Sequence, residues 1–184
     1  MFKSNYYKIF LKLNKVSFGK NLNLFGVPLI FKKKGSVLKI GDDCSIKSSF
    51  LSNLIGMNHR TIIVTRTEVA KINIGNNVGI SGATIYARKG VTIGDNTLIG
   101  GNVKILDNDF HPIEVKARNR DDKDMIRCIE VSIGKNCFIG CNSIILKGSK
   151  IGDGCVVGAG SVVSGEFPEN VIIGGNPANI IKVV

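Results

Sequence analysis

Residues 131–165 read VSIGKNCFIGCNSIILKGSKIGDGCVVGAGSVVSG, and an aliphatic residue recurs in them at every sixth position. The series consists of Ile133, Ile139, Ile145, Ile151, Val157 and Val163. Glycine follows four of these residues, at positions 134, 140, 152 and 158. A small residue, Cys or Ser, stands four positions after each of the first five. A repeat of this length predicts a β-solenoid, in which short strands are joined by tight corners.

The two marked positions of the repeat have different packing roles. We expect the aliphatic side chain to fill the inside of each coil, and the small residue to point inward where a larger one would collide. Glycine and asparagine supply the backbone angles of the corners, and successive coils stack about 4.8 Å apart. Weaker copies begin at Ile40, Ile74, Ile80 and Ile93, so the prediction extends over most of the chain.

The charge of the chain is concentrated near its N-terminus. The 184 residues carry a net charge of +11, which invites a nucleic-acid or membrane interpretation. Residues 1–39 contain nine lysines and no Asp or Glu, which leaves only +2 for residues 40–184. The longest apolar runs, such as Ile144–Leu146, are too short to cross a bilayer. The basicity therefore belongs to an N-terminal arm.

Residues 1–15 form this arm, and their pattern predicts a short helix. The apolar residues at helical spacing are Phe2, Tyr6, Ile9, Phe10 and Leu13, with lysines among them. The lysines and the lack of a small-residue cleavage site argue against a secretory signal. One interpretation is a helix that covers an end of the solenoid; the other is an interfacial helix attracted to anionic lipid. No recognition motif accompanies the charge, so we expect no nucleic-acid partner.

The cysteines indicate the compartment. The five are Cys44, Cys128, Cys137, Cys141 and Cys155, an odd number without CxxC spacing. We interpret them as reduced thiols of a cytoplasmic protein. Under the lipid interpretation of the arm, the protein would lie at the inner face of the membrane.

The repeat fails between Ile105 and Val131, and residues 107–130 are polar and rich in charges of both signs. A long excursion from a rigid solenoid is usually functional or disordered. His111 stands near its start, and a neutral imidazole is suited to abstracting a proton near neutral pH. The other histidine, His59, has no such context, and we expect it to be structural or on the surface.

Together with the repeats, the segments HPI at 111–113 and ARN at 117–119 resemble the hexapeptide-repeat acyltransferases, and most of all the sugar O-acetyltransferases of the galactoside and maltose type. The resemblance implies an all-β, single-domain left-handed parallel β-helix over residues 16–184, with a C-terminal segment at 164–184 and the arm at 1–15 in front. It also implies a homotrimer with active sites between subunits. Acetyl-CoA would be the co-substrate, no metal would take part, and His111 would be the general base.

The same resemblance implies further site residues. The acceptor candidates are Ser81, Asp107 and Asp109, with Tyr86 and Asn102 as weaker ones. For Asp107 and Asp109, a role in forming the turn is an equal alternative. The acetyl-CoA candidates are Cys141, Ala159, Ser164, Gly165, Asn179 and Lys182. Relatives often carry a basic residue where Asn179 and Gly165 stand, which leaves Lys182 as the principal phosphate candidate.

The implied function is transfer of an acetyl group to a hydroxyl of a sugar or surface-polysaccharide precursor, through a ternary complex. Two alternatives remain. One is an antibiotic or amino-sugar N-acetyltransferase of the same fold, and the other is a scaffold that contacts membranes through its basic arm. A zinc-dependent β-helix enzyme of the carbonic anhydrase type would need three histidines, and the chain has two. The sequence does not identify the acceptor or the acyl group.

Overall fold

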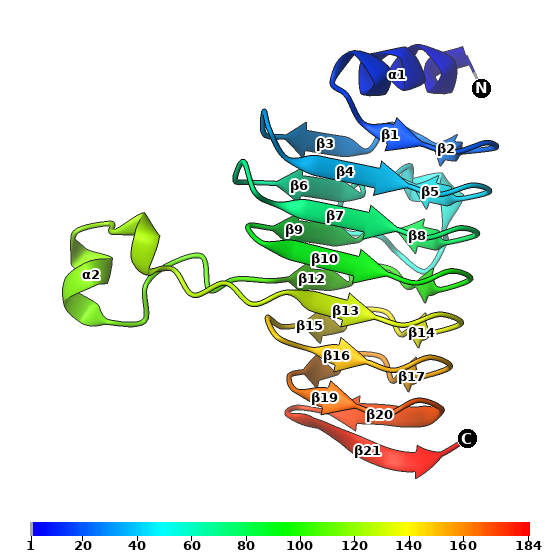
Figure 1. The fold of residues 1–184 in the computed structure, drawn as a ribbon. Coiled ribbons are helices and arrows are strands. Elements are labelled where there is room, and N and C mark those ends of the chain that lie inside the picture. Colours follow the sequence, from blue (N-terminus) through cyan, green and yellow to red (C-terminus); the bar gives the residue numbers. More distant parts are fainter. Residues whose placement is uncertain (1) are drawn as a thin grey trace.

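Each coil of the chain contributes one short strand to each of three sheets, which together form a three-sided prism (Figure 1). The computed structural model describes residues 2–184, with side chains from Tyr6 onward. The first sheet, sheet A, contains β1 (Ser17–Phe18), β4 (Val37–Ile40), β7 (Lys71–Ile74), β10 (Gly90–Ile93), β13 (Val131–Ile133), β16 (Lys150–Ile151) and β19 (Glu166–Phe167).

The other two sheets follow the same stacking order. Sheet B contains β2 (Asn23–Phe25), β5 (Ser45–Lys47), β8 (Gly79–Ser81), β11 (Leu98–Ile99), β14 (Phe138–Ile139), β17 (Val156–Val157), β20 (Val171–Gly175) and β21 (Ala178–Val183). Sheet C contains β3 (Leu29–Lys32), β6 (Ile62–Thr65), β9 (Thr84–Ala87), β12 (Lys104–Leu106), β15 (Ile144–Ile145) and β18 (Val162–Val163). The strand pairs are parallel except β20–β21, where the chain turns back on itself.

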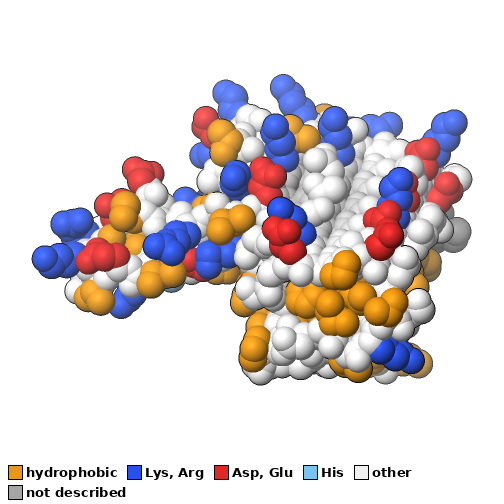
Figure 2. All heavy atoms as spheres, turned by 60° about the horizontal axis from the view of Figure 1, so that its bottom comes forward, with side chains coloured by type: hydrophobic (Ala, Val, Ile, Leu, Met, Phe, Trp, Pro, Cys, Tyr) orange, Lys and Arg blue, Asp and Glu red, His pale blue; other side chains and the backbone are white. Residues whose placement is uncertain are grey.

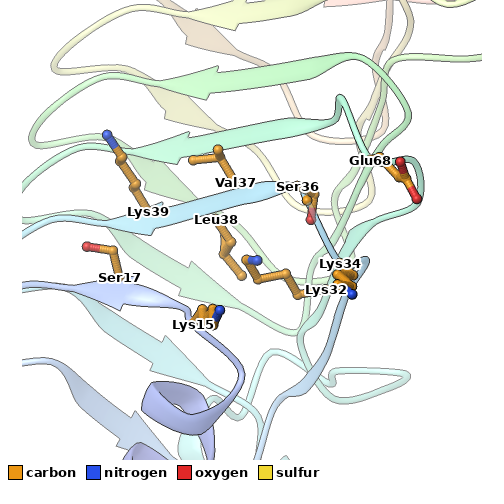
Figure 3. A pocket seen from close by; sticks show the side chains of 10 residues that line it. Lys15, Ser17, Lys32, Lys34, Ser36, Val37, Leu38, Lys39 and Glu68 are labelled. Carbon is orange, nitrogen blue, oxygen red and sulfur yellow. The ribbon is translucent and has the colours of Figure 1, made fainter.

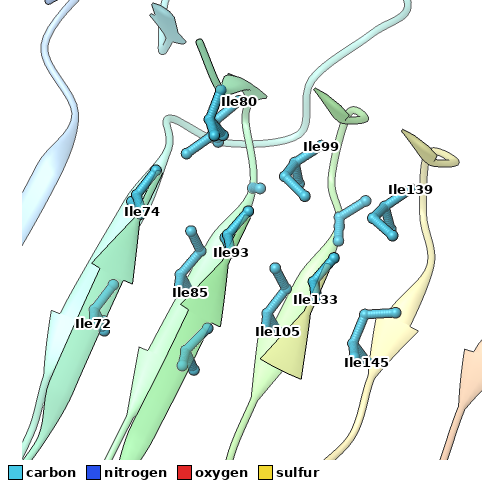
Figure 4. Close-up of a cluster of buried hydrophobic side chains, with 14 of the residues drawn as sticks. Ile72, Ile74, Ile80, Ile85, Ile93, Ile99, Ile105, Ile133, Ile139 and Ile145 are labelled. Atoms are coloured by element: carbon cyan, nitrogen blue, oxygen red, sulfur yellow. The ribbon is translucent and has the colours of Figure 1, made fainter. Parts of the chain in front are cut away.

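The strand register aligns the repeat positions in three columns inside the prism. The columns are Ile74–Ile93–Ile133–Ile151, Ile80–Ile99–Ile139–Val157 and Ile85–Ile105–Ile145–Val163. All of these side chains are buried, and Figure 4 shows those from Ile74 to Ile145 stacked against one another. The predicted left-handed parallel β-helix is confirmed.

The small residues of the repeat also point inward. Ser143, Ser149 and Ser161 are buried with Cys137 and Cys155. The Cys137 thiol donates a hydrogen bond to the carbonyl of Gly152 over 3.1 Å. Burial raises the pKa of this thiol to about 11, so it stays protonated at neutral pH and acts as a packing group.

The corners depend on glycine and asparagine. Asn77, Asn96 and Asn136 have positive φ and stack from coil to coil, with side-chain hydrogen bonds of 3.0 and 3.1 Å between neighbours. A Cβ added at Gly94 would lie 2.5 Å from the carbonyl carbon of Gly134 in the next coil. These contacts explain why the repeat keeps both residue types.

Helix α1 (Phe2–Leu13) lies across the N-terminal end of the prism, at the top of Figure 1. Leu11 is fully buried in the core and Tyr7 packs partly against it. By contrast, Tyr6, Ile9, Phe10 and Leu13 are exposed, and the side chain of Phe2 lies outside the described residues. Helical spacing predicted the helix, but the residues that it picked out are not the ones that pack on the core.

Two segments leave the prism at its corners. Residues 107–130 depart between β12 and β13, where sheet C gives way to sheet A, and include α2 (Val115–Asn119) and a 3₁₀ turn at Lys123–Met125. They stand away from the prism and carry charges of both signs (Figures 1 and 2). Residues 48–61, with a 3₁₀ turn at Phe50–Ser52, depart between sheets B and C. None of the helices within residues 2–184 is long and apolar enough to span a membrane.

The buried columns predict a large difference between two neighbouring residues of β11. Ile99 points into the prism and is 2% exposed, whereas Leu98 points outward and is 55% exposed. We expect Ile99→Ala to lower the free energy of unfolding by about 2–5 kcal/mol, and Leu98→Ala by less than about 1 kcal/mol. Urea denaturation of both variants measures this, and equal losses would contradict the assigned register.

Candidate active site

A groove of about 430 Å³ runs along the outside of sheet B. Its floor is formed by residues of β8, β11, β14 and β17 and of the corners that follow them. Ser81, Cys141 and Ala159 line it together with the apolar side chains of Leu98 and Phe138. Three of the predicted site residues are thus brought together on one face of the prism.

The groove offers unpaired main-chain donors. Around it, the N–H of Gly140 donates to Val157 and the N–H of Gly160 donates to Cys141, over 2.8 and 2.9 Å. Within residues 2–184, no acceptor is found for the N–H of Cys141 or of Ala159. An unpaired N–H beside a groove is available to a carbonyl group of a ligand. The corner residues here are small, so an extended ligand can approach the backbone closely.

One wall of the groove was missed by the sequence analysis. Asn53 and Ile55, in the segment 48–61, line it. Asn102 holds this segment in place, because its side chain accepts from the N–H of Asn58 over 2.7 Å and donates to the carbonyl of Gly56 over 3.0 Å. The interruption of the repeat in residues 48–61 was the signal that could have identified this wall.

Asp107 closes the base of the excursion 107–130. It is fully buried, and its carboxylate accepts hydrogen bonds from the N–H groups of Arg88, Lys89 and Gly90 over 2.6–3.0 Å. The side-chain amide of Asn108 donates a further bond over 2.9 Å. Both carboxylate oxygens of Asp107 are engaged inside the protein, so the side chain holds the corner. Nothing in this geometry presents the carboxylate to the substrate that would accept the acetyl group.

His111 lies at the outer end of the same turn and is exposed. The main-chain N–H of His111 donates to the carbonyl of Asp109 over 2.7 Å. The side chain of Asn108 accepts from the main-chain N–H of Phe110 over 2.9 Å. Phe110 has a φ of 62°, and its ring lies 4.8 Å from that of Tyr86. The backbone of the turn is thus fixed, while the imidazole has no hydrogen-bond partner among the described residues. The imidazole ring of His111 is therefore available to a substrate.

An ion pair anchors the turn to the next coil. Asp109 Oδ1 lies 2.5 Å from Lys147 Nζ, and both side chains are largely shielded, at 20% and 24% exposure. Asp109 Oδ2 is buried and finds no partner in the described part of the chain. Because Lys147 follows β15, this pair ties the residue two positions before His111 to the body of the prism.

The predicted site residues fall into two groups on different parts of the prism. His111, Ser164 and Gly165 lie at the corner between sheets C and A, because they follow β12 and β18. The groove residues lie on sheet B and at its corner with sheet C. Asn179 and Lys182 belong to β21, which extends sheet B beyond β20, and Lys182 stands opposite Ile172. Sheet C separates His111 from the groove of its own chain.

The remaining histidine, His59, is half-buried in the segment 48–61. Its Nδ1 lies 2.8 Å from the carbonyl oxygen of Arg60. It lines a hollow of about 250 Å³ together with Asn102 and Asn142. Its position is that of a surface residue.

Known protein families match two parts of the chain. The family described as bacterial transferase hexapeptide (six repeats) matches residues 130–165, and the hexapeptide repeat of succinyl-transferase matches residues 90–105. These two segments carry the hexapeptide repeats of bacterial transferases. The matched residues include the inward-facing aliphatic side chains from Ile93 to Ile105 and from Ile133 to Val163.

Individual relatives agree with this. Galactoside O-acetyltransferase of Escherichia coli is 36% identical over 116 residues, which cover 62% of this chain and 55% of the relative. An Escherichia coli protein provisionally named a lipopolysaccharide biosynthesis O-acetyl transferase is 41% identical over 103 residues, which cover 53% of each chain. The chain thus spans about half the length of these curated relatives.

Solved structures extend the likeness to most of the fold. A galactoside acetyltransferase in complex with coenzyme A has a TM-score of 0.56 and 26% identity, over 90% of this chain and 65% of the other. An N-acyltransferase from Bacillus cereus, in complex with dTDP and coenzyme A, has a TM-score of 0.70 over 94% of this chain and 88% of the other. At 23% identity, this second likeness concerns the fold alone.

The geometry of Asp107 predicts that its loss affects stability. Asp107→Asn places an amide N–H₂ where the carboxylate receives main-chain donors, and we expect the free energy of unfolding to fall by about 1–3 kcal/mol. Asp121→Asn, at an exposed carboxylate of the same excursion, is the matched control and should change it by less than about 0.5 kcal/mol. Urea denaturation compares the two, and a similar effect of both would contradict the structural role.

Proposed function

We propose that this chain is an acetyl-CoA-dependent acetyltransferase that acylates a hydroxyl of a sugar or surface-polysaccharide precursor. The observation that carries the proposal is the groove on sheet B with the free N–H groups of Cys141 and Ala159. The galactoside acetyltransferase that shares the fold is bound to coenzyme A. The names of two relatives, galactoside and lipopolysaccharide O-acetyltransferase, support a sugar acceptor.

The acyl donor would lie along the groove with its pantetheine arm against Cys141 and Ala159. The amide carbonyls of that arm need donors, and the two free N–H groups supply them. Asn179 and Lys182 lie further toward the C-terminal end of sheet B. Lys182 is exposed and would pair with a phosphate of the nucleotide. The thioester then lies toward the N-terminal end of the groove, near Ser81, which remains our candidate for contact with the acceptor.

A homotrimer would complete the site. Within one chain, His111 and the groove lie on different edges of the prism, so the base cannot reach an acyl donor bound in its own groove. A neighbouring copy that sets its corner between sheets C and A against sheet B would bring His111 over the groove. Ser164 and Gly165 would arrive with the same edge. A head-to-tail contact of this kind closes into a ring when three copies repeat it.

His111 would act as the general base. In the ternary complex, the imidazole removes the proton of the acceptor hydroxyl, and the oxygen attacks the thioester carbonyl. The negative charge of the tetrahedral intermediate is stabilised by main-chain N–H groups of the groove. The intermediate collapses with expulsion of the coenzyme A thiolate, which takes the proton from the imidazolium. Holding both substrates together supplies much of the rate, and no acyl-enzyme is needed.

The proposal predicts the effect of removing the base. His111→Ala should lower turnover by about 10²–10⁴-fold, with the fold intact, because the imidazole is exposed and without partners in the described chain. Release of free thiol from acetyl-CoA measures turnover, in a screen of sugars, nucleotide sugars and oligosaccharides. Acetyl-CoA binding, measured by isothermal titration, should persist in the variant.

His59→Ala is the matched control, since His59 is the other histidine and has no place in the proposed mechanism. It should retain nearly full turnover. Near wild-type turnover of His111→Ala would remove His111 from the mechanism. If the unmodified protein does not bind acetyl-CoA, the proposed function is wrong.

A further inference from the structure

The N-terminal end of the prism presents an apolar surface that the fold does not cover. On α1, Tyr6, Ile9, Phe10 and Leu13 are exposed, Leu13 by 77% and Tyr6 by 73%. The helix is held to the prism by Leu11 and Tyr7, whereas these four side chains do not belong to the core. The ring of Phe10 stacks on that of Tyr7, with centroids 5.3 Å apart. An open apolar hollow of about 390 Å³ lies between α1 and Val27. An exposed surface of this kind commonly marks an interaction site.

A positively charged hollow lies next to this surface. It has a volume of about 720 Å³ and is lined by Lys15, Lys32, Lys34 and Lys39, with Glu68 as its single carboxylate. Lys15 follows the end of α1 closely, and Figure 3 shows the helix beside it. The apolar face of α1 and the lysine hollow are therefore adjacent parts of one end of the molecule.

The lysines of this end whose side chains the structure describes form no ion pairs. Within the described chain, ion pairs of lysine involve Lys123, Lys147 and Lys150, and none involves a lysine before position 40. Residues 1–39 contain no Asp or Glu at all. Uncompensated charge on one end of a protein attracts an anionic surface over about 10 Å at moderate ionic strength.

We propose that this end docks on a lipid bilayer that contains anionic phospholipid. Helix α1 lies in the interface, with Tyr6, Ile9, Phe10 and Leu13 among the acyl chains and headgroups, and the lysine hollow receives lipid phosphates. Its 12 residues span about 18 Å, which suits a helix lying in the membrane plane. With its N-terminal end on the membrane, the prism extends away from the bilayer. The groove on sheet B then stays exposed. It does not depend on the proposed catalytic function.

Charge complementarity favours the bilayer over a second copy of the chain. Two copies packed through this end would bring two sets of unpaired lysines together. A nucleic acid would satisfy the lysines but would leave the aliphatic side chains of Ile9 and Leu13 uncovered. A bilayer with anionic headgroups satisfies both the charge and the apolar face.

The experiment is flotation of the full-length protein with phosphatidylcholine vesicles, with and without phosphatidylglycerol. We expect binding to the anionic vesicles, with weaker binding at high salt. Ile9→Gln with Leu13→Gln should reduce the fraction bound, through an affinity loss of about tenfold or more. Lys32→Gln with Lys34→Gln should reduce affinity about tenfold, since each lysine near an anionic surface contributes about 1 kcal/mol. Deletion of residues 1–15 is unsuitable because it also removes the buried Leu11.

Two control pairs make the test specific. Leu51→Gln with Leu54→Gln removes two exposed aliphatic side chains elsewhere, and Lys116→Gln with Lys135→Gln removes the same charge elsewhere. Both should bind like the wild type, and thermal unfolding verifies that all variants are folded. The proposal is overturned if the wild type does not float with anionic vesicles, if it binds neutral vesicles equally, if either test pair binds like the wild type, or if a control pair loses as much.

Discussion

Main-chain hydrogen bonds between successive coils hold the whole molecule in a single register. The N–H of Gly94 donates to Ile133 and that of Gly134 donates to Ile151, over 2.8 and 2.9 Å, and comparable bonds recur along the prism. Because each coil repeats the position of the one before, the inward-facing residues must repeat their size and character. Extra residues cannot be absorbed within a strand and must leave at a corner. The prism thereby fixes where segments of irregular sequence can lie.

The two parts of the proposed site are held by the excursions at the corners of the prism. One excursion carries the turn that exposes His111, and the other supplies a wall of the groove on sheet B. Both are tied down by side chains of regular coils, Lys147 and Asn102 respectively. Under the proposed mechanism, the rigid prism holds His111 and the groove on different edges, which a neighbouring copy would bring together.

Local sequence was sufficient for the features that depend on the repeat. Ile133 and Cys137 could be assigned to the interior because each occupies a fixed place in six residues, and His111 stood out because the repeat stops around it. Asp107 could not be assigned from sequence, because the N–H groups that it binds belong to the preceding coil. The exposed side of α1 could not be predicted either, because apolar residues occur around much of the helix and only the docking of Leu11 selects the buried side.

The central claim is that the site is shared between copies, and mixed oligomers test it most directly. His111→Ala chains keep the groove, whereas Ala159→Trp chains keep the base and block the groove at an exposed residue. Each homo-oligomer should be nearly inactive. After co-expression in equal amounts, random trimers with sites between neighbours should recover about one quarter of wild-type turnover. Activity no greater than that of the two inactive parents would show that base and groove do not meet across a subunit boundary.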